Sequence, residues 1–262
     1  MARLRIVTPA TLIGLLFMAS TLVSPLYVLY QQAFGFSDVT LTLVYSVYVL
    51  GNLVALLFFG RLSDQIGRRI AAGWAIAVAA VSTLLFLLAQ GTGWLYLARA
   101  LSGFAIGIAS GTGTAWLVEL LGGDEPEYAS LVATTANFTG LAIGSLLAGY
   151  LAQYEPSPLH LSFAMYLAAL APLALLVRAT PETVDRPLEL RHVSLRPRLG
   201  LPASVRRRFI APAAAAFGIF SLIGFYAALA PSLVKERLQI ENAALRGAIL
   251  GELFLVSALA MI

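Results

Sequence analysis

The chain has 262 residues, a formal net charge of +4 and no cysteine, and 60% of its residues are hydrophobic while only 11% are charged. Soluble domains average about 45–50% apolar and about 25% charged residues, so this chain carries too little charge to cover a globule in water. The composition predicts an integral membrane protein and excludes a disulfide framework, a thiolate metal site and a cysteine nucleophile.

Eight apolar stretches are long enough to cross a membrane, because a bilayer core needs about 20 apolar residues in a helix. In chain order they are Thr8–Tyr30, Thr40–Phe59, Ala71–Ala89, Trp94–Leu117, Ala129–Ala152, Leu159–Val177, Phe209–Ala230 and Ala244–Ile262. The first is longer than a signal-peptide core of about 7–15 residues, so we expect a retained helix. The sequence therefore predicts an all-α membrane protein.

Arginine and lysine are distributed unevenly among the segments between these stretches. With the N-terminus inside, the cytoplasmic segments hold thirteen of the seventeen: 2 in 1–7, 3 in 60–70, none in 118–128 and 8 in 178–208. The outer segments hold only Lys235 and Arg237. Because positive charge marks the cytoplasmic side, we predict a multi-pass protein of the cell membrane with a cytoplasmic N-terminus. These loop arginines lack the interleaved aromatics of nucleic-acid readers, so no nucleic-acid partner is expected.

The segment 60–70 must reverse the chain between two uncharged stretches. Gly60 and Gly67 permit a tight backbone, and Asp64 is placed to cap the following helix and to pair with Arg68 or Arg69. The order Gly-x-Leu-x-Asp-x-x-Gly-Arg-Arg resembles the signature of the loop between helices 2 and 3 in transporters of the major facilitator superfamily. The resemblance implies the fold of that superfamily and assigns these five residues to a conformational latch.

Glu119 ends the fourth stretch, where the helix macrodipole disfavours negative charge. A cationic neighbour would offset that effect. In the superfamily the acid at this place pairs with the arginines of the helix 2–3 loop. We therefore expect Glu119 to join the latch through Arg68 or Arg69, although a solvated charge at a helix end needs no function.

Three parts are expected from the resemblance: a six-helix N-terminal lobe (1–178), a cytoplasmic linker (179–208) and a partial C-terminal lobe of two helices (209–262). The linker is rich in proline and arginine and shows no periodicity. It opens with Pro181-Glu182-Thr183, which is similar to a sequence that often follows helix 6 in the superfamily. Since members usually have twelve helices, we expect about four more after Ile262, and no complete transport cycle from residues 1–262 alone.

Arg99 lies within the fourth stretch, where an arginine at mid-bilayer costs about 2.5–3.5 kcal/mol even on lenient scales. Near the outer end it could instead reach the lipid headgroups. The sequence Arg99-x-x-Ser102-Gly103 resembles the Arg-x-x-Gln-Gly signature of helix 4 in the superfamily. The resemblance implies a cavity-lining arginine that helps proton transfer or holds an anionic group of the substrate.

Other polar residues of the apolar stretches must face protein or a cavity, because lipid offers no hydrogen bonds. The predicted cavity set adds Ser24, Tyr27 and Gln31 of the first stretch, Asn137 of the fifth and Glu252 of the eighth. Glu252 is either a titrating coupling site or a protonated glutamate packed against other helices. Many proton-driven exporters of the superfamily carry a carboxylate in helix 1. This chain has none there, so proton coupling stays open.

Two sets of glycines are predicted to let helices pack closely, since small residues at a spacing of four allow backbones to approach. They are Gly103, Gly107 and Gly111 in the fourth stretch, and Gly140, Gly144 and Gly149 in the fifth. The second set resembles the antiporter signature Gly-x-x-x-Gly-Pro-x-x-Gly-Gly, with Ser145 in place of proline and Ala148 in place of glycine. In the superfamily that signature accompanies exporters.

The resulting hypothesis is a secondary active transporter that moves a small organic solute by alternating access, in the direction of export. An uptake permease, a non-transporting membrane scaffold or sensor, and an inactive fragment are the alternatives. The sequence shows no nucleophile–base pair, metal cluster or phosphate loop, so neither an enzyme nor a cofactor is expected. The expected partners are an unidentified small-molecule substrate and the lipid bilayer, with protons left open.

Overall fold

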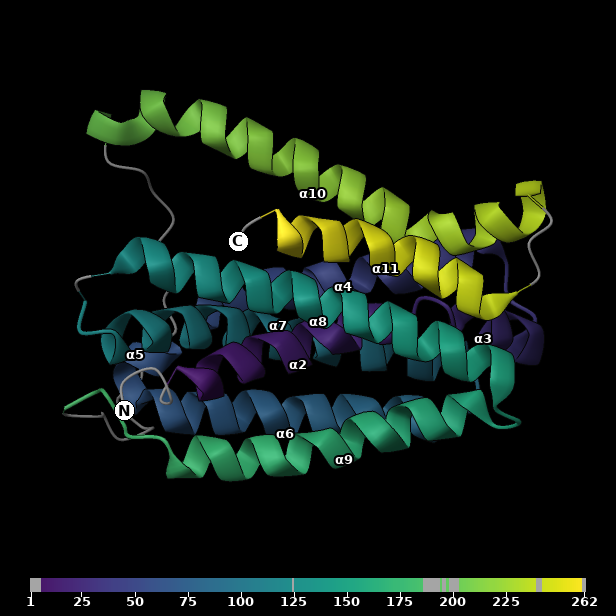
Figure 1. The fold of residues 1–262 in the computed structure, drawn as a ribbon, viewed down its shortest axis with the longest axis horizontal. Helices are drawn as coiled ribbons and strands as arrows, with labels where there is room; N and C mark the ends of the chain where they lie inside the picture. The colour runs from purple at the N-terminus through teal and green to yellow at the C-terminus, as the bar shows by residue number, and fades with distance from the viewer. Residues whose placement is uncertain are drawn as a thin grey trace.

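The computed structural model describes residues 6–123, 125–185, 194, 197, 203–238 and 242–260, and every regular element within these ranges is a helix (Figure 1). In chain order the helices are α2 (Val7–Leu22), α3 (Tyr27–Phe34), α4 (Asp38–Phe59), α5 (Leu62–Ile66), α6 (Arg68–Leu87), α7 (Thr92–Leu120), α8 (Pro126–Tyr154), α9 (Pro158–Ala179), α10 (Ala203–Leu238) and α11 (Ala243–Leu259). The predicted all-α class is confirmed.

Within the described residues, five helices are long and apolar enough to cross a membrane, namely α4, α6, α7, α8 and α9. The pair α2 and α3 makes a sixth span if it is counted as one broken helix. Much of the outer surface of α4 is apolar, and Leu50, Leu53 and Leu57 are exposed along it. An apolar surface of this extent suits lipid, and the chain is a multi-pass membrane protein.

The first predicted span, Thr8–Tyr30, is not one continuous helix. α2 ends at Leu22, a turn covers residues 23–26, and α3 continues at an angle of 42°. Pro25 lies in this turn and has no N–H to donate, and its ring obstructs the carbonyl one helical turn earlier. The run is apolar along its whole length, as predicted, but it is broken at the turn that contains Pro25.

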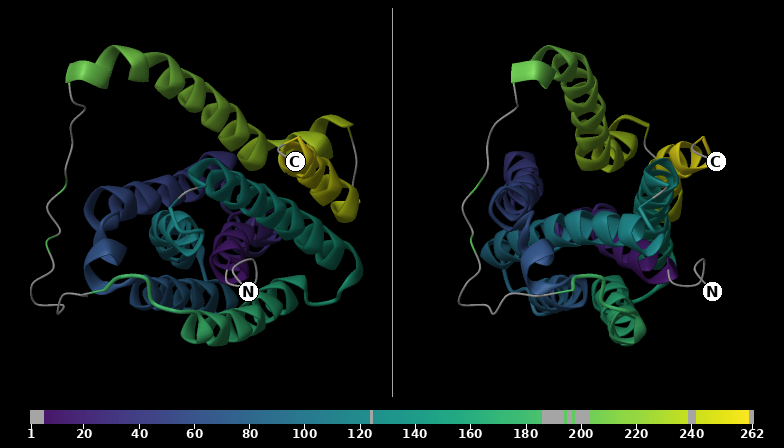
Figure 2. Two further views of the ribbon diagram at one scale, coloured as in Figure 1. Left: turned by 60° about the vertical axis from the view of Figure 1, so that its left-hand side comes forward. Right: turned by 90° about the vertical axis from the view of Figure 1, so that its left-hand side faces the viewer.

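The helices lie roughly along the long axis of the molecule, with α7 among its neighbours rather than at an edge (Figures 1 and 2). α7 packs on α2, α4 and α6, while α2 also contacts α8 and α9. α11 packs on α8, on the side away from α6 and α9. The bundle therefore has two ends, called here the α5 end and the α3 end after the short helix that lies at each.

Five of the six predicted packing glycines lie where helix backbones cross closely. A Cβ at Gly103 would overlap the Tyr48 carbonyl oxygen of α4, and one at Gly140 would overlap that of Gly14 in α2. Gly107, Gly144 and Gly149 meet α4, α2 and α11 in the same way. Gly111 does not belong to this set, because a Cβ there would meet only one atom, the Gly60 carbonyl oxygen at 3.9 Å.

Helix α10 begins at Ala203, inside the predicted linker 179–208, rather than at Phe209. α11 contains 17 residues and covers most of the eighth predicted stretch. Residues 186–193, 195–196 and 198–202, which hold half of the predicted linker and four of its seven arginines, lie outside the described residues. The boundaries of the three predicted parts stay predictions.

Candidate functional site

The reversal between α4 and α6 is built around the one-turn helix α5. Gly67 has φ +100° and ψ 151°, and a Cβ there would lie 2.6 Å from Oε2 of Glu182. Glycine is thus favoured at 67 both by backbone conformation and by the carboxylate beside it. Gly60 has φ −56°, which any residue adopts, but a Cβ there would lie 2.5 Å from the Leu56 carbonyl oxygen.

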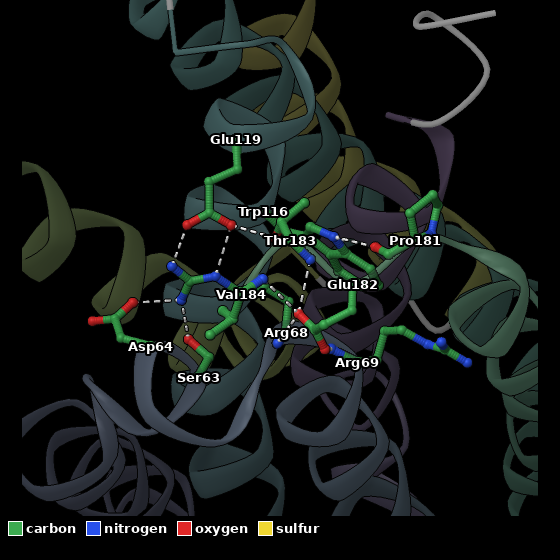
Figure 3. A network of polar contacts seen from close by, with 10 residues as sticks. All are labelled: Ser63, Asp64, Arg68, Arg69, Trp116, Glu119, Pro181, Glu182, Thr183 and Val184. Atoms are coloured by element: carbon green, nitrogen blue, oxygen red, sulfur yellow. Dashed lines mark hydrogen bonds and ion pairs between the residues drawn. The ribbon is translucent and has the colours of Figure 1, made fainter. Parts of the chain in front are cut away.

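Arg68 is the centre of a polar network at the α5 end (Figure 3). Its Nε and Nη2 donate to the two carboxylate oxygens of Glu119 at 3.0 and 2.5 Å, a bidentate pair. Its Nη1 lies 2.5 Å from Oγ of Ser63 and 2.6 Å from Oδ1 of Asp64. Glu119 therefore contacts Arg68 and not Arg69, whose Nη2 donates instead to the Arg178 carbonyl oxygen of α9 at 2.6 Å.

Glu182 caps α6 from a distant part of the sequence. Its carboxylate accepts the backbone N–H groups of Arg68 at 2.8 Å and Arg69 at 3.0 Å, and also those of Thr183 and Val184 (Figure 3). The N–H groups of Arg68 and Arg69 are orphan donors of the first turn of α6, and the Glu182 side chain satisfies them. Asp64 was expected both to cap this helix and to pair with Arg68 or Arg69; the pairing with Arg68 is present, but the capping expectation is wrong, because Glu182 accepts the first N–H groups of α6.

Two further contacts tie the segment after α9 to α7. The Thr183 hydroxyl donates to Glu119 at 2.5 Å, and Nε1 of the fully buried Trp116 donates to the Pro181 carbonyl oxygen at 3.2 Å. We use the name α5-end network for Ser63, Asp64, Arg68, Glu119, Glu182 and Thr183. Sequence reasoning missed the roles of Ser63, Trp116, Glu182 and Thr183, although the Pro-Glu-Thr sequence was a visible signal for the last two.

Arg99 is fully buried in α7, so the alternative in which it reaches the headgroups is wrong. Its Nη1 donates to the Ser20 carbonyl oxygen of α2 at 3.3 Å. Its guanidinium carbon lies 4.8, 5.0 and 5.9 Å from the ring centroids of Tyr48, Tyr45 and Tyr27. These five residues form the Arg99 cluster, which draws on four helices, α2, α3, α4 and α7.

The charge of Arg99 is incompletely compensated within the described residues. Its hydrogen bond and its three ring contacts all involve neutral groups, and its Nε and Nη2 have no hydrogen-bond partner there. Each cation–π contact contributes about 0.5–2 kcal/mol, whereas removing an ion from water costs several kcal/mol even after relaxation. The Nε and Nη2 edge of the guanidinium group is therefore buried without a hydrogen-bond partner in the described residues.

Of the other predicted cavity residues, some lie near the Arg99 cluster and others do not. Ser24 is buried beside the cluster on the turn before α3, and its hydroxyl has no hydrogen-bond partner within the described residues. Gln31 points elsewhere, because its amide donates to Oδ1 of Asp38 at 2.8 Å. Asn137 is half-buried on α8, and no contact places it against Arg99. Glu252 is exposed on α11, so the expectation that it packs against other helices is wrong for the described part of the chain.

A family profile described as Major Facilitator Superfamily matches residues 10–262. The chain belongs to the Major Facilitator Superfamily. No curated protein sequence matches it. The resemblance of segment 60–70 to the helix 2–3 loop therefore pointed to the correct family.

Solved structures of peptide transporters share the fold. The chain is similar to a peptide transporter POT (E310Q mutant) in complex with sulfate, with a TM-score of 0.58 and 15% identity over 85% of this chain and 45% of that one. It is also similar to tetrameric PepTSo2, with a TM-score of 0.58 and 16% identity over 89% of this chain and 49% of that one. A bacterial homologue of the human drug peptide transporters PepT1 and PepT2 is similar with a TM-score of 0.59 and 15% identity over 98% of this chain and 52% of that one. The chain spans about half the length of these transporters.

Proposed function

We propose that this superfamily chain is part of a secondary active transporter that exports a small organic solute by alternating access, and that Arg99 holds an anionic group of that solute. The observation that carries the proposal is a fully buried guanidinium group whose Nε and Nη2 have no hydrogen-bond partner in the described residues. Intramembrane ionisable residues mark substrate or ion pathways because they are costly to keep there.

A comparison of Arg99 with Arg68 supports the proposed role of Arg99. Arg68 uses its Nε and Nη2 edge to bind both oxygens of Glu119. Arg99 leaves that same edge without a partner in the described residues, while its Nη1 is held by Ser20. A planar guanidinium group matches a carboxylate or phosphate through two parallel hydrogen bonds, and a ligand that supplies them would complete the site. The tyrosine rings around it suit an organic body.

Export and alternating access rest on separate features. The glycines of α8 resemble the antiporter signature, and this resemblance supports export. The α5-end network joins α5, α6, α7 and the segment after α9, so it suits a latch that holds one conformation while the lobes rock. In the orientation expected from the arginine and lysine distribution, this latch faces the cytoplasm.

Binding by the purified chain tests the role of Arg99. Small aromatic carboxylates should raise its thermal unfolding temperature in nonionic detergent, whereas the matching primary amides should not. Arg99→Lys and Arg99→Gln should each lose the effect, since neither has the bidentate donor edge. Arg206→Gln is the matched control, because it removes the same charge from the exposed surface of α10.

The proposal fails if a folded Arg99→Gln protein is stabilised by carboxylates as strongly as the unchanged chain. Direction is tested by flux in inverted membrane vesicles that contain the complete transporter. Accumulation of the same carboxylate inside inverted vesicles supports export. Accumulation only in right-side-out vesicles would instead establish an uptake permease.

A further inference from the structure

Three consecutive arginines, Arg206, Arg207 and Arg208, lie in the first two turns of α10. All three residues are exposed, and the N-terminal half of α10 stands away from the other helices (Figures 1 and 2). Both ion pairs found among the described residues involve Arg68 instead, and the first turn of α10 contains no acid. The charges of the three arginines are therefore uncompensated within the described part of the chain.

The sequence around these arginines carries charge of one sign only. From Leu190 to Val234 it contains no lysine, aspartate or glutamate. The same stretch contains six arginines: Arg191, Arg196, Arg198, Arg206, Arg207 and Arg208. Clusters of about 4–8 basic residues beside a membrane-spanning helix are typical of segments that bind anionic lipids. The composition of this stretch is therefore complementary to an anionic membrane surface.

Because α10 begins at Ala203, the three arginines belong to a helix and not to an irregular linker. Successive residues of an α-helix turn by about 100° and rise by about 1.5 Å, so the three side chains spread over about 200° of the circumference at nearly one level. Phe209 and Ile210 follow directly and are 49% and 64% exposed. No residue from Phe209 to Val234 is charged. The arginines thus lie at the polar boundary of a long apolar part of α10.

We propose that the segment Ala203–Ile210, named here the α10 basic end, docks onto the phosphate headgroups of an anionic phospholipid membrane. A guanidinium group binds phosphate through two parallel hydrogen bonds, and its charge is attracted to anionic lipids. The exposed Phe209 and Ile210 suit the boundary between headgroups and acyl chains, where apolar side chains of membrane-surface helices are buried. A free anion in water would pair with the arginines but would leave these two side chains exposed. The basic end therefore holds the start of α10 at the membrane surface.

Lipid-selective quenching in the reconstituted full chain tests this docking. Val205→Cys provides a single labelling site beside the arginines, because the chain has no cysteine. In phosphatidylcholine vesicles, nitroxide-labelled phosphatidylglycerol should quench a fluorophore at this site at a mole fraction about tenfold or more below that needed for nitroxide-labelled phosphatidylcholine. The expectation follows because each arginine near an anionic surface strengthens binding about fivefold. At about 1 M NaCl the difference should disappear, since exposed charges are then screened beyond about 3 Å.

Two sets of variants show whether the arginines cause the preference. Replacing Arg206, Arg207 and Arg208 together by glutamine should make the two lipids quench equally. Replacing them by lysine keeps the charge and should retain most of the preference, although lysine binds phosphate as a point charge. Arg61→Gln combined with Arg178→Gln is the control, since both are exposed arginines of the α5 end, and it should leave the preference unchanged. All these positions are exposed, so the variants should fold.

The docking is independent of the Arg99 cluster, so Arg99→Gln should leave the lipid preference unchanged. Conversely, nonionic detergent offers no anionic surface, and Arg206→Gln there remains a control for carboxylate binding at Arg99. An unchanged preference for phosphatidylglycerol in the glutamine variant would overturn the proposal. So would a preference that inorganic phosphate abolishes and sodium chloride at equal ionic strength does not, because the arginines would then form a site for a free anion.

Discussion

The crossing of α4 and α7 determines how Tyr48 lies over Arg99, and Gly103→Ala should disturb it. An alanine Cβ at 103 would overlap the Tyr48 carbonyl oxygen and lie 3.1 Å from the Asn52 nitrogen. Both are backbone atoms, so the two helices have to separate rather than rotate a side chain. Overpacking of this kind costs about 1–3 kcal/mol, partly offset by a gain in helix propensity of about 0.8–1.0 kcal/mol.

Gly111→Ala is the matched control for this substitution. Gly111 lies two turns further along α7, and a Cβ there would meet only the Gly60 carbonyl oxygen at 3.9 Å. The control gains the same helix propensity without the overlap. The two variants should therefore differ in free energy of unfolding by about 1–3 kcal/mol, the cost of overpacking alone. Equilibrium unfolding in mixed micelles measures this, and a difference below about 0.5 kcal/mol would refute the close crossing.

Two predictions concern the proposed mechanism and topology. Asp64→Asn, made in the complete transporter, should slow transport while leaving equilibrium binding of substrate unchanged. The reason is that the substitution weakens one contact of Arg68, far from Arg99. A parallel fall in substrate binding would contradict the role of a latch. Asp38→Cys should react with a membrane-impermeant maleimide in intact cells, since the chain has no other cysteine and residues 31–39 are expected outside. Reaction only in inverted vesicles would reverse the topology.

Features that depend on residues close together in the sequence, such as apolar runs and charges at helix ends, could be predicted from the sequence. Hydropathy located six of the eight predicted spans, namely α4, α6, α7, α8, α9 and the broken pair α2 and α3, and the macrodipole argument anticipated a cation beside Glu119. The break in the first span was less apparent, because Pro25 lies in an apolar run that continues on both sides. The length of a run predicts a crossing of the bilayer but not whether the helix bends within it.

Contacts between distant segments were harder to predict. Gly103 and Gly111 lie on the same helix with the same spacing pattern, yet only the first meets another backbone closely, since the crossing point depends on how whole helices pack. Asp64 was the obvious capping residue for α6 by position, but Glu182 occupies that place from beyond α7, α8 and α9. Tyr45 and Tyr48 lie three residues apart in one apolar stretch, but their position around Arg99 follows only from the tertiary structure.

The cap formed by Glu182 leads to a prediction that separates it from an ordinary surface charge. Glu182→Gln replaces one of two acceptor oxygens by an N–H donor in front of several backbone N–H groups, so at least part of the cap is lost. Loss of a cap costs about 0.5–2 kcal/mol, and loss of a negative charge at a helix N-terminus about 0.3–1 kcal/mol more.

The effect of Glu182→Gln should appear locally, as faster hydrogen–deuterium exchange in peptides that cover the first turn of α6. Asp185→Asn is the matched control, since Asp185 is an exposed carboxylate of the same segment. If the segment after α9 holds the α5-end network together, Glu182→Gln should also loosen the peptide around Glu119, which Thr183 contacts. Unchanged exchange at both places would mean that α6 keeps its first turn without Glu182. The contacts of the segment after α9 with the α5-end network would then contribute nothing measurable to its stability.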